Sequence, residues 1–186
     1  MEKNKNMKIE NSQSRELKMN NSPMRQIEIE KMVLNCGGIE DKLERSIKLL
    51  EMMTKRKIQV VKSTKRIPDF GISPGKKSGC KVTLRNNKQI IELLKRFFAA
   101  LDNNIKSKQI VNNHFSFGLK EYIEIPGLEY NRDIGILGFE ADVSFKRKGK
   151  RVKYKKIKQG KYPKRQDVTK EEIVEFLKKN FKLNIQ

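Results

Sequence analysis

The residues best suited to bind a ligand are polar side chains that alternate along a short predicted strand, residues 80–85. Successive side chains of a strand point to opposite faces, so Cys80, Val82 and Leu84 share a face suited to helix packing. The opposite face carries two cations and a hydroxyl, from Lys81, Thr83 and Arg85. Cations and hydroxyls contact phosphates, sugars and base edges, so this face predicts a nucleic-acid site. An ordinary solvated face would show the same pattern, so this strand alone does not distinguish a nucleic-acid site from a solvated surface.

Two runs of basic residues lie elsewhere in the chain. Residues 146–165 hold twelve Lys and Arg and no acid, with Tyr154 and Tyr162 interleaved. Each cation that neutralises a phosphate releases counterions, so we expect this run to bind RNA, with contacts from Lys153, Lys155 and Lys156. The alternative is a nonspecific polybasic tail or a nuclear-import patch, and the capped helix predicted after the run argues against it. The shorter run follows a predicted strand, and we expect its cations, Lys62, Lys65 and Arg66, to bind RNA as well.

The overall charge also favours a polyanionic partner. The 186 residues contain 43 Lys and Arg and 22 Asp and Glu, a formal net charge of +21. Such an excess repels itself unless a polyanion neutralises it, so we expect nucleic acid or an anionic membrane surface as partner. A membrane is disfavoured because no stretch approaches about 20 apolar residues and no helix pattern has a strongly basic face with exposed aromatics. The two cysteines suit reduced thiols, and no export signal is evident, which predicts a cytoplasmic protein.

Catalytic and metal-binding patterns are weak. The candidate zinc ligands stand singly and lack the spacing of a zinc site: Cys36, Cys80 and His114. The segment 71–78 ends like a phosphate-binding loop but lacks the spacing of that motif. Glu140 and Asp142 share a strand face, and a solvated or partner-facing acidic patch is the favoured interpretation of this pair. The alternative function is an RNA-binding protein of another class, or an RNA-processing enzyme with a metal at Glu140 and Asp142. We expect no enzyme activity, no cofactor and no metal.

A folded domain must position these residues. Residues 1–23 are polar without a periodic apolar pattern and are expected to form a mobile tail, while residues 24–186 form a single domain. Periodicity predicts strands at residues 27–34, 58–61, 80–85, 115–125 and 139–145, helices at 39–53, 90–105 and 169–181, and a long basic loop at 67–78. The last helix opens with a Thr-Lys-Glu-Glu capping box. The pattern indicates an α+β fold, an antiparallel sheet with helices packed on one face and the other face open for RNA.

Several blocks of this sequence resemble the large-subunit ribosomal protein L-five family, whose eukaryotic members are called ribosomal protein L-eleven. They follow the family's order from about residue 23 to the end: Pro23–Arg25, Ile29–Asn35, Gly79–Arg85, Asn113–Ile123, Ile134–Gly138 and Pro163–Glu172. The Pro-Met-Arg start and the Thr-Lys-Glu-Glu helix look like the archaeal and eukaryotic branch.

The resemblance implies a structural protein of the central protuberance that binds 5S rRNA and other large-subunit rRNA. It also implies contact with P-site tRNA, an L-eighteen family neighbour, and a bridge to the small-subunit head protein S-thirteen. Two RNA contacts of the family fall on Asn35 and Thr83, and a third, usually Gln, falls on Arg56. The family's tRNA-facing loop falls on residues 67–78, and its residues here are Phe70, Gly71, Ile72, Ser73, Pro74, Gly75, Lys76 and Lys77.

Overall fold

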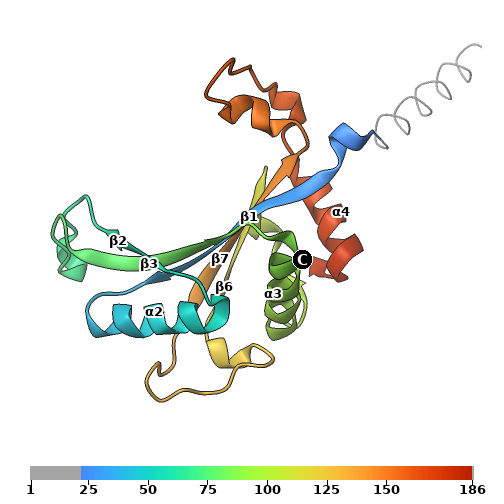
Figure 1. The fold of residues 1–186 in the computed structure, drawn as a ribbon. Coiled ribbons are helices and arrows are strands. Elements are labelled where there is room, and N and C mark those ends of the chain that lie inside the picture. Colours follow the sequence, from blue (N-terminus) through green and yellow to red (C-terminus); the bar gives the residue numbers. More distant parts are fainter. Residues whose placement is uncertain (1–21, 186) are drawn as a thin grey trace, which may run out of the picture.

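The structure is a computed structural model that describes residues 22–185, so nearly all of the expected tail at residues 1–23 lies outside the described residues. The helices and strands follow one another along the chain as shown in Figure 1. They are β1 (Ile27–Gly37), α2 (Asp41–Thr54), β2 (Gln59–Lys62), β3 (Lys77–Leu84), α3 (Asn87–Ala100), β4 (Asn104–Ile105), β5 (Ile110–Val111), β6 (His114–Leu119), β7 (Phe139–Arg147), α4 (Lys170–Phe181) and β8 (Asn184–Ile185). Short 3₁₀ turns lie at Pro23–Arg25, Pro68–Phe70, Ser107–Gln109, Tyr122–Glu124, Lys150–Tyr154 and Lys164–Gln166.

A six-stranded antiparallel sheet forms the centre of the domain, in the order β2-β3-β1-β7-β6-β5. The long strand β1 pairs on one side with β3, where Asn35 opposes Lys81, and on the other with β7, where Asn35 opposes Glu140. A register shift between Ile29 and Lys31 marks an irregularity near the start of β1. The short strands β4 and β8 pair in parallel in a separate two-stranded sheet. The expected α+β architecture is confirmed.

The core lies between one face of the sheet and the helices. Helix α2 packs against β1 and β3, and α3 packs against β1 (Figure 1). Helix α4 packs against β5. The strands bury every second side chain, as in the series Phe139, Ala141, Val143 and Phe145 of β7. Aromatic side chains join the layers, and the ring centroids of Phe97 and Phe139 are 5.3 Å apart in an edge-to-face arrangement. This alternation buries one face of the sheet and leaves the other face with polar side chains.

The second predicted helix is shorter than its apolar pattern indicated. It ends at Ala100, and not at Ile105, because Asp102 and Asn103 adopt left-handed backbone angles with φ of 52° and 58°. Asn tolerates this conformation better than most residues, and two such residues in succession cannot continue a right-handed helix. Ile105 is buried as expected, but it lies in β4.

Two predicted strand boundaries also differ. The strand expected over residues 115–125 ends at Leu119, and a 3₁₀ turn begins at the buried Tyr122. The hydroxyl of Tyr122 accepts a 2.9 Å hydrogen bond from the amide of Asn131. The strand expected at residue 80 begins at Lys77. The loop expected over residues 67–78 therefore ends before Lys77, and its last two residues belong to the sheet.

The capping box predicted for the last helix is confirmed. The Thr169 hydroxyl accepts a hydrogen bond from the amide of Glu172, and the Glu172 carboxylate accepts one from the amide of Thr169. The same carboxylate accepts from Nη2 of Arg147 at 2.6 Å with both oxygens. Arg147 ends β7, is buried, and also donates to the carbonyl oxygen of Arg25. The cap of α4 thus connects the helix to the sheet and to the beginning of the described chain.

Candidate nucleic-acid interface

The polar side chains predicted to bind RNA lie on the face of the sheet opposite the buried core. Asn35 of β1, Lys81 of β3 and Gln59 of β2 are cross-strand partners and form one row. Thr83 lies in the next row, beside Val33 of β1. All of these side chains are half-buried or exposed, whereas Cys80, Val82 and Leu84 are buried on the opposite face. The predicted alternation of residues 80–85 is therefore confirmed.

An open hollow of about 580 Å³ lies on this face, where β2 begins and β3 ends. The segment before β2 and the end of β3 form its walls, and the lining residues are Arg56, Lys57, Gln59, Lys81, Val82, Thr83 and Arg85. Nη2 of Arg56 donates a 3.0 Å hydrogen bond to Oε1 of Gln89 at the start of α3, which holds the guanidinium near the hollow. The fold thus brings together Arg56, Lys81, Thr83 and Arg85, and no acidic residue lines the hollow. We call this set, with Asn35, Lys57 and Gln59, the cationic face.

The other half of the open face has a different chemistry. On β7, Glu140 opposes Asn35, and Asp142 opposes Val33 of β1 and Ser116 of β6. The two carboxylates share the face as predicted. Among residues 22–185, no group of three or more His, Cys, Asp or Glu side chains could hold a metal ion. The charge of the open face therefore changes from positive along β2 and β3 to negative along β7.

The predicted tRNA-facing loop is a hairpin extension between β2 and β3 that is held by backbone hydrogen bonds. The amide of Ser63 donates to the carbonyl of Lys76, and the amide of Gly75 donates to the carbonyl of Ser63. Farther out, Ile67 and Ile72 exchange two backbone hydrogen bonds of 2.9 and 3.1 Å. Phe70, next to the turn at Gly71, is 70% exposed.

The cations of this hairpin have different environments. Lys62, Lys65 and Arg66 are exposed. Lys76 forms a 3.0 Å ion pair with Glu40 before α2, so its charge is partly neutralised, and Lys77 lies in β3. Of the remaining predicted loop residues, Ile72 pairs with Ile67, whereas Ser73, Pro74 and Gly75 belong to a turn in which the amide of Lys76 donates to the carbonyl of Ser73.

The basic run of residues 146–165 is a third cationic surface, separate from the cationic face. It begins in β7 and then forms an excursion, orange in Figure 1, that projects beyond the end of the sheet before α4. Lys153, Lys155 and Lys156 are exposed there. Lys150 instead pairs with Glu30 at 2.7 Å. Burial lowers the pKa of Lys150, but the hydrogen bond and charge of Glu30 outweigh it, so the pKa is raised above its usual value.

The two cysteines oppose each other directly across β1 and β3. Both are free thiols, and both side chains are buried in the core beneath Asn35 and Lys81. The hydrogen bond with Cys80 and burial raise the pKa of the Cys36 thiol. His114, the third candidate zinc ligand of the sequence, is exposed at the start of β6 on the open face.

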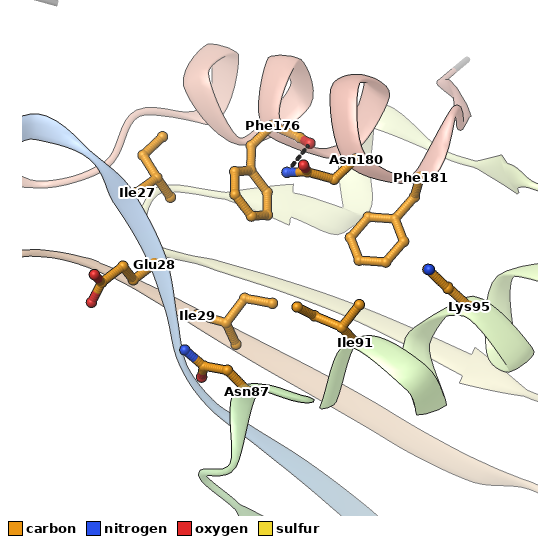
Figure 2. Close-up of a pocket in the computed structure, with 9 residues that line it drawn as sticks. All are labelled: Ile27, Glu28, Ile29, Asn87, Ile91, Lys95, Phe176, Asn180 and Phe181. Atoms are coloured by element: carbon orange, nitrogen blue, oxygen red, sulfur yellow. Dashed lines mark hydrogen bonds between the residues drawn. The ribbon is translucent and has the colours of Figure 1, made fainter. Parts of the chain in front are cut away.

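A fourth surface feature is an apolar groove of about 450 Å³ on the helix side of the sheet (Figure 2). Ile27 and Ile29 of β1, Ile91 of α3, and Phe176 and Phe181 of α4 give it apolar walls. Lys95 is the cation among its lining residues. With these walls the groove does not resemble a phosphate-binding surface.

Comparison with known proteins identifies the family. The family model that describes the C-terminus of the ribosomal L-five family matches residues 77–176. "Large ribosomal subunit protein uL5" of Nanoarchaeum equitans is 38% identical over 165 residues, which cover 88% of this chain and 98% of the relative. The protein of the same name from Methanosphaera stadtmanae is 38% identical over 161 residues, covering 85% of this chain and 95% of the relative. The chain belongs to the uL5 family of ribosomal proteins.

Membership of the uL5 family confirms the resemblance seen in the sequence blocks. The family is one of structural, RNA-binding ribosomal proteins and not of enzymes, so the metal-dependent RNA-processing hypothesis for Glu140 and Asp142 is not supported. The relatives named here are archaeal, in agreement with the branch expected from the closing helix. In the described part of the chain, no helix has the length and apolar character to cross a membrane.

The structure adds two residues to the predicted uL5 interface. Lys57 and Gln59 line the hollow with the predicted cations. The sequence carried a signal for them, because Lys57 and Gln59 alternate with Ile58 and Val60, and both of these apolar residues pack against the core. The pairing of β2 with β3, which brings them beside Lys81, could not be known from the strand patterns alone.

Proposed function

We propose that this chain is a structural component of the large ribosomal subunit that binds 5S rRNA through the cationic face. The observation that carries the proposal is the row formed by Asn35, Lys81 and Gln59, which lies on the sheet face opposite the helices. The family resemblance assigns RNA contacts to Asn35 and Thr83, and these two lie on the same open face. In this role the protein helps to attach 5S rRNA to the central protuberance, in the ribosome of the cytoplasm.

The residues of the cationic face divide into two kinds of contact. Arg56, Lys57, Lys81 and Arg85 provide positive charge for phosphates, which fixes the position of the RNA without reading its sequence. Asn35, Gln59 and Thr83 provide amides and a hydroxyl, which hydrogen-bond 2′-hydroxyls and base edges. Arg56 replaces the Gln that is usual in the family and keeps a donor at that place. The mechanism is therefore recognition of a folded RNA shape, with no chemical step.

Further RNA contacts belong to the proposal. The hairpin between β2 and β3 reaches P-site tRNA, with the exposed Phe70 near its end. The exposed Lys62, Lys65 and Arg66 contact phosphates of rRNA. The exposed Lys153, Lys155 and Lys156 contact large-subunit rRNA. The backbone hydrogen bonds of the hairpin support its proposed contact with tRNA, because a preformed loop loses less conformational entropy on binding.

The protein partners follow from the family resemblance alone. They are the neighbouring L-eighteen family protein on the large subunit and the protein S-thirteen of the small-subunit head. The acidic half of the open face, with Glu140 and Asp142, lies beside the cationic face and is less suited to phosphates. It leaves room for a second, protein contact on the same side of the sheet.

Titration of 5S rRNA with three proteins at matched salt tests the proposal. We expect Asn35→Ala combined with Thr83→Ala to lose two hydrogen-bonding groups, about 1–3 kcal/mol in total, which is roughly 5- to 150-fold in affinity. The matched control combines Lys155→Ala with Lys156→Ala, and we expect a smaller loss together with a weaker salt dependence. Equal losses in the two variants, or equal binding of 5S rRNA and unrelated RNA by the unmodified protein, would contradict a specific site on the sheet.

A further inference from the structure

The excursion between β7 and α4 presents apolar side chains at a place where its other residues are cationic. Ile157 is 81% exposed, Tyr154 is 61% exposed, and Val152 is 39% exposed. The exposed residues beside them are positively charged and include Arg151, Lys153, Lys155, Lys156 and Lys158. No acid occurs from residue 148 to residue 166. We call residues 150–160 the basic tip.

The basic tip is a closed and anchored structure. A 3₁₀ turn runs from Lys150 to Tyr154, and the amide of Gly160 donates to the carbonyl of Val152 at 3.2 Å, which closes the loop. Gly160 lies so close to Val152 that a Cβ atom there would be 2.6 Å from Cγ1 of Val152, so a larger residue would have to displace the Val152 side chain. At the base, Lys150 pairs with Glu30 of β1. The exposure of Tyr154 and Ile157 is therefore set by the structure of the loop.

The other tyrosine of the basic run has a different environment. Tyr162 is half-buried, and its hydroxyl donates a 2.7 Å hydrogen bond to the carbonyl oxygen of Gln166. Its role is thus to support the return of the chain toward α4. Of the two tyrosines in the basic run, Tyr154 is therefore the one with an exposed side chain.

These observations define the chemistry of the occupant. It must be polyanionic to match the cations around the tip, and it must offer an apolar flat surface to cover Tyr154 and Ile157. Nucleobases flanked by phosphates have both properties, and a base exposes its flat face only where it is unpaired. We propose that the basic tip binds an unpaired RNA nucleotide, whose base stacks on Tyr154 and contacts Ile157 while its phosphates meet Lys155 and Lys156.

This inference rests on the proposed function, because it assumes that RNA covers the basic run, and it names the RNA feature recognised there. The test uses the full chain and two RNA duplexes that differ by one bulged 2-aminopurine, a base whose fluorescence is quenched by stacking. We expect the unmodified protein to bind the bulged duplex more tightly and to quench its fluorescence. Tyr154→Ala weakens this binding by roughly 5- to 150-fold, abolishes the quenching, and leaves the affinity for the unbulged duplex unchanged.

Two control variants separate stacking from charge and from general exposure of an aromatic ring. Tyr130 is a matched tyrosine, 58% exposed on another loop, and Tyr130→Ala is expected to leave both affinities unchanged. The combination of Lys155→Ala and Lys156→Ala is expected to weaken binding of both duplexes alike and to reduce the salt slope by up to about 1.8.

The same proteins are also titrated with a 5S rRNA transcript, so that the two proposals can fail separately. If the unmodified protein binds 5S rRNA but binds both duplexes equally and without quenching, the unpaired-base inference is overturned and the proposed function stands. If it binds the bulged duplex with quenching but does not prefer 5S rRNA to unrelated RNA, the proposed function is overturned and the basic tip stands as a site for unpaired bases. Loss of quenching in Tyr130→Ala as well as in Tyr154→Ala would also overturn the assignment to the tip.

Discussion

Removal of the Glu172 carboxylate is expected to destabilise the protein more than removal of any neighbouring surface charge. This carboxylate accepts from Nη2 of Arg147 with both oxygens at 2.6 Å, and it also caps the amide of Thr169. The side chain of Arg147 is 8% exposed, whereas that of Glu172 is 35% exposed. Loss of one partner of a buried ion pair costs about 3–5 kcal/mol, and water around the exposed part of Glu172 reduces this to about 2–3 kcal/mol.

The lost cap adds about 1 kcal/mol, so Glu172→Ala is expected to lower the free energy of unfolding by about 3–4 kcal/mol. Equilibrium urea unfolding measures this value. Thr169→Ala removes only the capping hydroxyl and should cost about 1 kcal/mol, while Glu171→Ala, at an exposed position of the same helical turn, should cost less than about 1 kcal/mol. A loss in Glu172→Ala no greater than in Thr169→Ala would refute the role assigned to the Arg147 pair. Arg147→Met in the Glu172→Ala background should recover part of the loss, because no unpaired buried charge then remains.

Other properties of the fold give three further predictions. Phe98→Ala should lower the free energy of unfolding in urea by about 3–5 kcal/mol, because the buried ring contacts Phe115, Phe117 and Phe181. Phe70→Ala, at the exposed hairpin, should change it by less than about 0.5 kcal/mol. Similar losses in the two variants would contradict the assignment of Phe98 to the core. Cys36 and Cys80 should not react with a thiol reagent in the folded protein and should both react in urea, so rapid labelling of the native protein would show that the sheet does not bury them. The stabilisation from Lys150 should be fully present below pH 10.5 and should disappear as the pH rises through the raised pKa of the folded state. The difference in unfolding free energy between Lys150→Met and the unmodified protein should therefore shrink at high pH. A difference independent of pH would contradict the ion pair with Glu30.

The sequence was most informative where local patterns and tertiary packing agree. The alternation of residues 80–85 predicted which side chains of β3 face the core, because the period of a strand is short and one face must be buried. The capping box at Thr169 predicted the start of α4, because its hydrogen bonds lie within one turn of the helix. Both features depend on residues that are neighbours in the chain.

Two kinds of feature were missed: the end of one helix, and contacts between residues that are distant in the chain. The apolar period of the second helix continued to Ile105, and the positions of Asp102 and Asn103, which end the helix, became clear only from their backbone angles. The strand pairing that places Gln59 beside Lys81 joins segments separated by the whole hairpin. The partner of Lys76 is Glu40, which no local pattern connects to the loop. Sequence reasoning thus gave the candidate cations but not which of them are already neutralised.

Most residues of the cationic face were therefore predicted from the sequence, but their arrangement on one surface was not. Lys81, Thr83 and Arg85 came from alternation, and Asn35 and Arg56 came from the family resemblance. The antiparallel pairing of β1, β2 and β3 is what places them on one surface. For the basic tip, the sequence showed the basic composition but did not indicate that Ile157 is exposed.

The central claim is that RNA lies on the sheet face opposite the helices, and directed cleavage of 5S rRNA from a tethered iron chelate tests it most directly. Val61→Cys places the chelate on β2 beside the cationic face without removing one of its residues, and Glu175→Cys places it at an exposed position of α4; the native thiols are buried. We expect localised cleavage of bound 5S rRNA from residue 61 and little cleavage from residue 175. Equal cleavage from both positions, or stronger cleavage from α4, would contradict the claim.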